Sequence, residues 1–179
     1  MSMRKSLALA ALAATLCSGV ALAQTSGLGK PLAEADIKPW DISILPDGTN
    51  LPPGSGTSAV GAKIYAEKCA VCHGPEGKGG GAPGAGPLVG GPPLSTGIDV
   101  AKTIGNYYAY ATTVFDFIRR AMPATAPRSL KDDEVYALTA YILSLNKIIK
   151  EDDVMDAKNL PVVKMPNRDN FSLPYPDRI

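Results

Sequence analysis

Cys69-Ala70-Val71-Cys72-His73 is the stretch of sequence that decides the fold. Residues three apart on a helical turn lie on one face, so both thiols of this stretch can bond a single planar group. The next side chain, that of His73, can then lie beneath the centre of that group. This spacing is the attachment motif of c-type haem, in which the histidine is the proximal ligand of the iron. The motif predicts one covalent haem c, bound by Cys69, Cys72 and His73.

Other uses of two cysteines fit the sequence less well. An exported protein usually joins two cysteines in a disulfide, but here a histidine directly follows the pair. A zinc site needs about four ligands, and the chain has no second cysteine pair and no histidine other than His73. A thioredoxin-like pair stands in a strand-helix-strand pattern, whereas a loop rich in glycine and proline follows His73. The single histidine of the chain occupies the position that the haem motif requires.

Residues 1–23 predict export. Arg4 and Lys5 precede an apolar run over 7–23, which ends in the small-x-small sequence Ala21-Leu22-Ala23. This order of basic, apolar and small residues is typical of a secretory signal peptide. A permanent membrane anchor is the alternative, because the run is close to the shortest membrane span of about 17 residues. The cleavage site favours removal of the peptide, and hence a periplasmic protein without a membrane segment.

The charge balance of the chain gives no sign of a nucleic-acid partner. Without Arg4 and Lys5, 16 basic residues face 17 acidic residues, and no basic run stands out. A protein that binds nucleic acid normally carries a basic patch or stripe. The sequence therefore predicts no nucleic-acid partner.

The far side of the iron needs a second ligand. The only histidine is already used, and the thioether of methionine is the usual partner in electron-transfer cytochromes. Met122 precedes Pro123, which cannot extend a helix, so the chain leaves the helix there and can present the thioether to the iron. Met165 in the C-terminal tail and an open sixth position are the alternatives, and either methionine could instead fill the core. The sequence favours iron ligation by His73 and Met122.

Three helices are expected around these ligands, over residues 57–72, 113–122 and 129–147. Their apolar residues recur every three or four positions, which is typical of helices that bury one face. The first and third helices begin at residues that are good N-caps, namely Thr57 or Ser58 for the first and Ser129 for the third.

The loop over 74–91 separates the first two helices and is rich in glycine and proline. Such a composition lets backbone pass close to the face of a haem. A histidine that binds a metal normally donates its second N–H to a fixed acceptor. We expect the Pro87 carbonyl to accept this hydrogen bond from His73.

The order of these features resembles class I monohaem cytochromes c. In that family an N-terminal helix crosses a C-terminal helix, and loops enclose the haem. The resemblance covers about 56–147 and implies an all-α fold. It also implies that the helix with Gly61 and Tyr65 crosses the one with Leu138, Tyr141 and Ile142.

Two further segments, 24–55 and 149–179, flank the predicted haem domain of residues 56–148. They contain apolar side chains that are costly to leave in water, which are Trp40, Ile42, Ile44, Phe171 and Tyr175. We expect extended N- and C-terminal arms that pack on the haem domain or on a partner protein. Flexible tails are the alternative.

A narrower resemblance rests on three runs, LPPGSGT at 51–57, YATTVFDFIRRAMP at 110–123 and MPNRD at 165–169. They are similar to the haem subunits of sulfur-oxidising dehydrogenases, which accompany a molybdenum protein that oxidises sulfite or protein-bound sulfane sulfur. The Sox-type subunit carries a further haem domain, whereas this chain has one haem motif. The sulfite dehydrogenase subunit, or a monohaem paralogue of the Sox-type subunit, is therefore the better match.

The resemblance implies a one-electron carrier without catalytic residues of its own. It would accept electrons from a molybdenum-containing sulfite or sulfur dehydrogenase subunit and pass them to a downstream cytochrome c. A free electron shuttle without a permanent partner is the main alternative. A haem peroxidase or a gas sensor is another, and it would require an open position on the iron.

Overall fold

The computed structural model describes residues 29–94 and 99–171. The chain divides into two compact units, 1–41 and 42–179. The predicted signal peptide, 1–23, lies outside the described residues. The described part of the first unit contains one short helix, α2 (Glu34–Ile37). The large apolar side chains of residues 29–41 are exposed, including Trp40 at 81%.

The haem motif lies where two helices of the second unit meet. Helix α3 (Ser58–Lys68) begins at the N-cap Thr57, whose hydroxyl accepts the Val60 N–H at 3.3 Å. It ends at Cys69, which leaves helical geometry with φ −124°, and α4 (Ala70–His73) follows. The single helix predicted through Cys72 is therefore wrong. The helix is interrupted at Cys69, and the Cys69 carbonyl then accepts the N–H groups of Cys72 and His73 in the next turn.

Helix α6 (Ala111–Ala121) begins two residues before the predicted residue 113 and ends one residue before the predicted Met122. Met122 is its extended C-cap, with φ −116° and ψ 147°, and its N–H still donates to the Ile118 carbonyl. Helix α5 (Ile104–Tyr107) precedes it and was not expected from the sequence. Thr103 caps α5 and exchanges hydrogen bonds with Asn106, which makes this single turn self-supporting.

Helix α7 (Asp132–Leu145) starts later than predicted. Its N-cap is Lys131 and not Ser129, because the Glu134 carboxylate accepts the Lys131 N–H at 2.8 Å and closes the first turn there. Leu130 is buried, so it turns inward just before the helix begins. The apolar residues of α7 form the centre of the core, and Val135, Tyr136 and Leu143 are completely buried.

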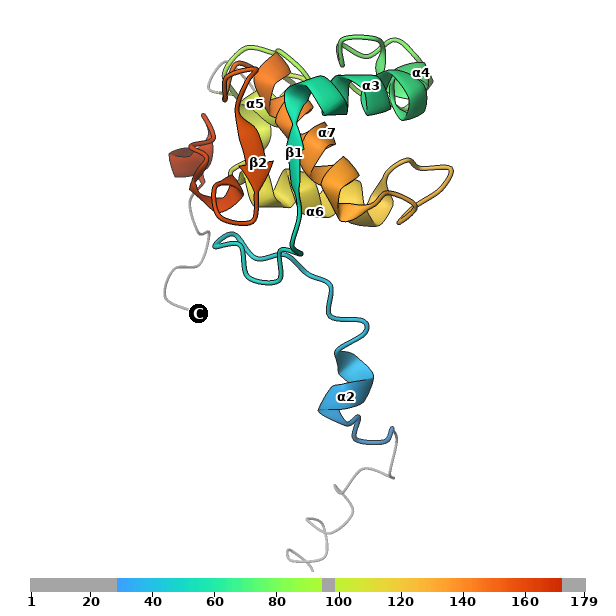
Figure 1. Ribbon diagram of the computed structural model, residues 1–179. Coiled ribbons are helices and arrows are strands. Elements are labelled where there is room, and N and C mark those ends of the chain that lie inside the picture. The colour runs from blue at the N-terminus through green and yellow to red at the C-terminus, as the bar shows by residue number, and fades with distance from the viewer. Residues whose placement is uncertain (1–28, 95–98, 172–179) are drawn as a thin grey trace, which may run out of the picture. The chain divides into compact units, whose positions relative to one another are not determined.

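Helices α3 and α7 cross at Gly61 (Figure 1). A Cβ at Gly61 would lie 1.9 Å from the Ala137 carbonyl oxygen and 2.8 Å from the Tyr141 Cβ. The rings of Tyr65 and Tyr141 lie next to this crossing, 5.3 Å apart. Only a residue without a side chain permits so close an approach, so the predicted crossing of the N- and C-terminal helices is confirmed.

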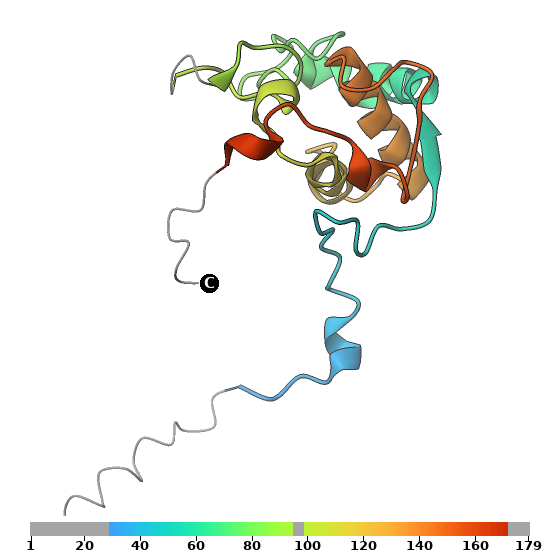
Figure 2. The ribbon, with the colours of Figure 1, turned by 90° about the vertical axis from the view of Figure 1, so that its left-hand side faces the viewer.

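The C-terminal segment packs onto the same unit. Strand β2 (Val154–Asp156) pairs antiparallel with β1 (Ser55–Thr57), and Gly56 lies opposite Met155. Two 3₁₀ turns follow, η3 (Leu160–Val162) and η4 (Arg168–Asn170). Figure 2 shows this segment, in red, running across α5 and α6. Its apolar side chains enter the core, since Met155, Leu160 and Met165 are each at most 4% exposed.

The fold is thus mostly helical, with one short antiparallel strand pair that the sequence did not predict. The described residues of the C-terminal arm pack on the haem domain itself. None of the described helices is long and apolar enough to cross a membrane.

Candidate haem site

The Cys-x-x-Cys-His motif forms one helical turn. The N–H groups of Cys72 and His73 both donate to the Cys69 carbonyl, at 3.1 and 3.0 Å. The side chains of Cys69, Cys72 and His73 are all half-buried. Burial raises the pKa of the Cys69 thiol to about 11, while neighbouring Lys68 lowers it and Cys72 raises it further. Cys69 therefore stays protonated at neutral pH unless it is bonded.

The following loop is folded tightly onto this turn. The Gly79 N–H donates to the His73 carbonyl at 2.9 Å, and the Ala82 N–H donates to the Cys72 carbonyl at 3.1 Å. These bonds satisfy carbonyl groups at the end of the helical turn, which have no partner within the helix. The buried hydroxyl of Tyr65 adds a third bond, to the Gly74 carbonyl at 3.0 Å. The loop of glycines and prolines is therefore held by hydrogen bonds on the haem-motif side.

The His73 ring meets the loop at a carbonyl, one residue before the predicted position. Its Nδ1 lies 3.2 Å from the carbonyl oxygen of Gly86. The predicted acceptor, the Pro87 carbonyl, is therefore wrong. Leu88 and Val89 explain the register, because their N–H groups both donate to the Gly77 carbonyl, at 2.7 and 3.0 Å. This pairing aligns the loop so that the Gly86 carbonyl reaches the imidazole.

A second set of contacts on this loop was not expected from the sequence. The Leu88 carbonyl accepts the Ile104 N–H at 3.1 Å and the Asn146 Nδ2–H at 3.2 Å. The Gly90 carbonyl accepts the Thr103 hydroxyl at 2.6 Å. Asn146 directly follows α7. A polar side chain at the end of an apolar helix is the feature of the sequence that could have indicated these contacts.

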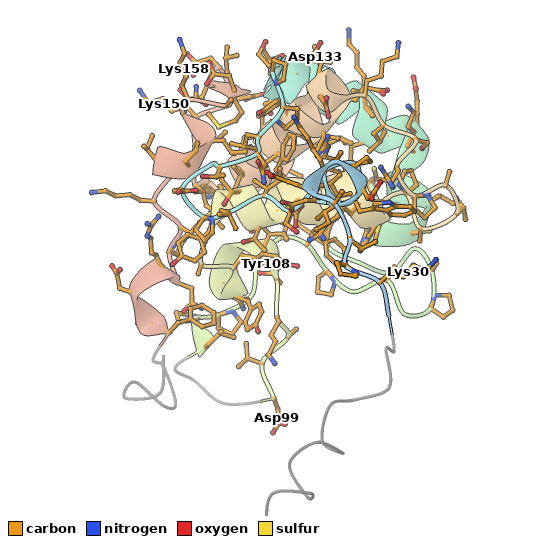
Figure 3. The ribbon with its side chains drawn as sticks, turned by 90° about the horizontal axis from the view of Figure 1, so that it is seen from below. Lys30, Asp99, Tyr108, Asp133, Lys150 and Lys158 are labelled. Atoms are coloured by element: carbon orange, nitrogen blue, oxygen red, sulfur yellow. The ribbon has the colours of Figure 1, made fainter. Side chains whose placement is uncertain are left out.

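The methionines separate into two classes. Met155 and Met165 are 4% and 3% exposed and belong to the core. Met122 is half-buried and packs against the edge of that core, as does Cys69. Tyr108, labelled in Figure 3, is another partly buried residue that packs against the core, and burial raises its pKa. Met122 is therefore the methionine whose thioether a bound group could still cover.

A cavity of about 710 Å³ lies elsewhere in this unit. Gly90, Gly105, Tyr107, Asn146 and Phe171 are among the residues that line it, and the four predicted haem-binding side chains are not. This cavity is therefore not the site indicated by the motif.

Two comparisons with known proteins decide the family. The family model for cytochrome c matches residues 58–146. A chain in the crystal structure of the sulfane dehydrogenase SoxCD from Paracoccus pantotrophus superposes with a TM-score of 0.73 and 38% identity, over 85% of this chain and 72% of that chain. The chain belongs to the cytochrome c family. Membership implies a covalently attached haem c and a role as an electron carrier.

A third comparison matches part of this cytochrome to another dehydrogenase of a sulfur compound. The thiosulfate dehydrogenase of Stutzerimonas stutzeri (strain A1501) is 34% identical over 96 residues. These residues make up 52% of this cytochrome but only 29% of that enzyme. The cytochrome therefore matches less than a third of that relative's length.

The residues present fit a haem. Cys69, Cys72 and His73 do not converge as a direct metal site, since the described residues contain no group of three His, Cys, Asp or Glu side chains that could hold an ion. They instead share one helical turn, as attachment to a flat macrocycle requires. A Cβ at Gly81 would lie 2.5 Å from the carbonyl oxygens of Val71 and Cys72, so the loop encloses the turn as closely as backbone can.

Proposed function

We propose that this cytochrome is the electron-transfer subunit of a periplasmic sulfur-compound dehydrogenase, whose molybdenum subunit supplies its electrons. The extent of the match to the sulfane dehydrogenase carries this proposal. That match covers 85% of the chain, well beyond the cytochrome c segment of residues 58–146. A generic electron carrier would share the haem segment alone, whereas this chain also shares flanking sequence.

The chain's own residues would bind and tune one haem, which supplies one-electron redox chemistry when bound. His73 would hold the iron through Nε2 while its Nδ1–H donates to Gly86, and Met122 would supply the sixth ligand. A thioether ligand raises the reduction potential, which suits a protein that accepts electrons from a dehydrogenase. The electrons would then pass to a downstream cytochrome c.

A pull-down from the native periplasm tests the proposal. The tagged cytochrome should retain a molybdenum-containing protein, and its haem should become reduced when the right sulfur compound is added. Sulfite and a protein-bound sulfane are the two substrates to compare. Reduction by sulfite alone would favour a sulfite dehydrogenase, and reduction by sulfane alone a sulfane dehydrogenase. A haem that neither compound reduces, in a preparation without molybdenum, would overturn the proposal in favour of a free shuttle.

The N-terminal arm is the segment that we expect to contact the partner. Within residues 29–41 the large apolar side chains Leu32, Ile37 and Trp40 are 69%, 47% and 81% exposed. Apolar groups exposed this far are typical of an interaction surface. Removal of residues 24–41 should weaken retention of the molybdenum protein and leave the haem spectrum unchanged.

The deletion must end before the segment that belongs to the core. Ile44 is 8% exposed, and the Pro52 carbonyl accepts the Tyr136 hydroxyl at 2.8 Å, so a longer deletion would also destabilise the haem domain. Trp40→Ala is the milder variant of the same experiment. Unchanged retention in both variants would show that the arm does not bind the partner.

A further inference from the structure

The acceptor of the His73 hydrogen bond lies in an exposed part of the loop. Gly86 is exposed, and a Cβ at Gly86 or Gly90 would meet nothing within 4 Å. The loop contains no regular helix or strand between 86 and 90. Within the loop, the Gly77 carbonyl accepts the N–H groups of Leu88 and Val89. Any further support for the position of the Gly86 carbonyl comes from contacts outside the loop.

One side chain, that of Asn146, binds the backbone at two positions shortly after Gly86. Asn146 accepts the Gly90 N–H through Oδ1 at 3.1 Å, and its Nδ2 donates to the Leu88 carbonyl at 3.2 Å. The same Nδ2 also donates to the Ile142 carbonyl at 2.9 Å. A single amide thus fixes Leu88 and Gly90 to the end of α7, which is among the most buried elements of the unit.

A second observation shows that the fold makes room for this amide. Gly105 lies in α5, and a Cβ there would come within 2.4 Å of Asn146 Oδ1 and 3.1 Å of its Cγ. The α5 backbone therefore closes directly over the amide and limits the rotamers that Asn146 can adopt. A side chain confined in this way can position a loop more precisely than a solvent-exposed one.

We propose that Asn146 is a positioning residue for the axial ligand, because it holds the 86–90 loop so that the Gly86 carbonyl accepts the Nδ1–H of His73. The consequence concerns the iron. A hydrogen bond from Nδ1 increases the basicity of a ligating imidazole and so stabilises the oxidised metal. Loss of the Asn146 clamp should let the Gly86 carbonyl move, weaken that bond and raise the reduction potential.

This inference rests on the proposed ligation of iron by His73 and does not depend on the identity of the partner protein. The experiment replaces Asn146 with alanine in the full haem-loaded protein. Asn146→Ala should give a positive shift of the reduction potential in a spectroelectrochemical titration. The His73 Nδ1 proton, followed by NMR, should also exchange with water several-fold faster.

Asn159→Ala is the matched control. Asn159 likewise accepts a backbone N–H, from Asp156, and donates to a carbonyl, that of Val154, but it supports the C-terminal segment. Its replacement should lower stability by a similar amount and leave the potential and the exchange rate unchanged. Equal potentials and equal exchange rates in the two variants would overturn the proposal.

Gly105→Ala gives an independent variant if Asn146→Ala fails to assemble. The added methyl displaces the Asn146 amide without removing it, so the potential should shift in the same direction by a smaller amount. No shift in a correctly assembled Gly105→Ala protein would also contradict the clamp. The absorption spectrum of the unaltered protein tests the proposed axial ligands separately from the role of Asn146. A haem without low-spin character would refute those ligands.

Discussion

At the scale of single residues, burial distinguishes methionines that the sequence treats alike. Met122 and Met165 both precede a proline, and both were candidates for the sixth iron ligand. In the fold Met165 fills the core at 3% exposure, while Met122 lies half-buried at its edge, where α6 ends. A ligand has to reach outward to a group that is bound later, so Met122 remains the predicted one.

Replacing each methionine with leucine tests this assignment, because leucine has a similar volume and no sulfur. Met122→Leu should lose the low-spin spectrum and lower the reduction potential, since the thioether ligand is removed. Met165→Leu should keep both properties and cost less than about 1.5 kcal/mol of stability. Absorption spectra and chemical unfolding measure the two effects. A low-spin Met122→Leu protein would point to another ligand.

At the scale of elements, the start of α7 joins the other helices and a strand to one another. Three successive acidic residues each contact a different element. Asp132 pairs with Arg119 of α6 at 3.2 Å, Asp133 accepts the Ser55 N–H of β1 at 2.8 Å, and Glu134 pairs with Lys68 of α3 at 2.7 Å. Asp133 is labelled in Figure 3. All three lie in the first turn of α7, where the helix dipole also favours negative charge.

The α3–α7 crossing is the element-scale feature most sensitive to substitution. Gly61→Ala should destabilise the protein by about 3 kcal/mol or more, because the methyl would overlap the Ala137 backbone, which cannot move aside as a side chain can. Gly86→Ala adds the same methyl into open space and should change stability by less than about 1 kcal/mol. Urea unfolding compares the two variants. Equal stabilities would show that the helices can separate at the crossing.

At the scale of the whole unit, buried tyrosines join distant segments. The Tyr136 hydroxyl donates to the Pro52 carbonyl, so α7 holds the chain that precedes β1. The Tyr65 hydroxyl links α3 to the loop after the haem motif. Burial is the main cause that raises the pKa of each tyrosine to about 12.

These raised pKa values predict alkaline destabilisation. The folded protein keeps these phenolic protons above the ordinary tyrosine pKa of about 10, so it binds more protons there than the unfolded chain. The stability that the neutral hydroxyls contribute is complete below about pH 10 and is lost as the pH rises towards about 12.

Tyr136→Phe tests this dependence. At neutral pH the variant should lose on the order of 1 kcal/mol with its hydrogen bond to Pro52. Between about pH 10 and pH 12 its unfolding free energy should fall less steeply than that of the unaltered protein, by up to about 1.4 kcal/mol per pH unit. Urea unfolding at several pH values measures both slopes. Parallel slopes would mean that Tyr136 does not couple to the alkaline transition.

The sequence by itself determined the haem motif and the end of a helix just before Pro123. These features depend on local spacing or on a residue type that few positions require, so they can be read without knowledge of the fold. The sequence also determined the cytochrome c family, which the comparisons confirm.

Only the tertiary structure decided which groups meet across the chain. The Gly86 carbonyl, and not that of Pro87, faces His73 because Gly77 sets the register of the loop. Asn146 contacts that loop although more than fifty residues of sequence separate the two. Strand β2, which contains Met155, likewise pairs with β1 although the two strands are distant in sequence. Such contacts depend on how elements pack and leave no periodic signal in the segments that make them.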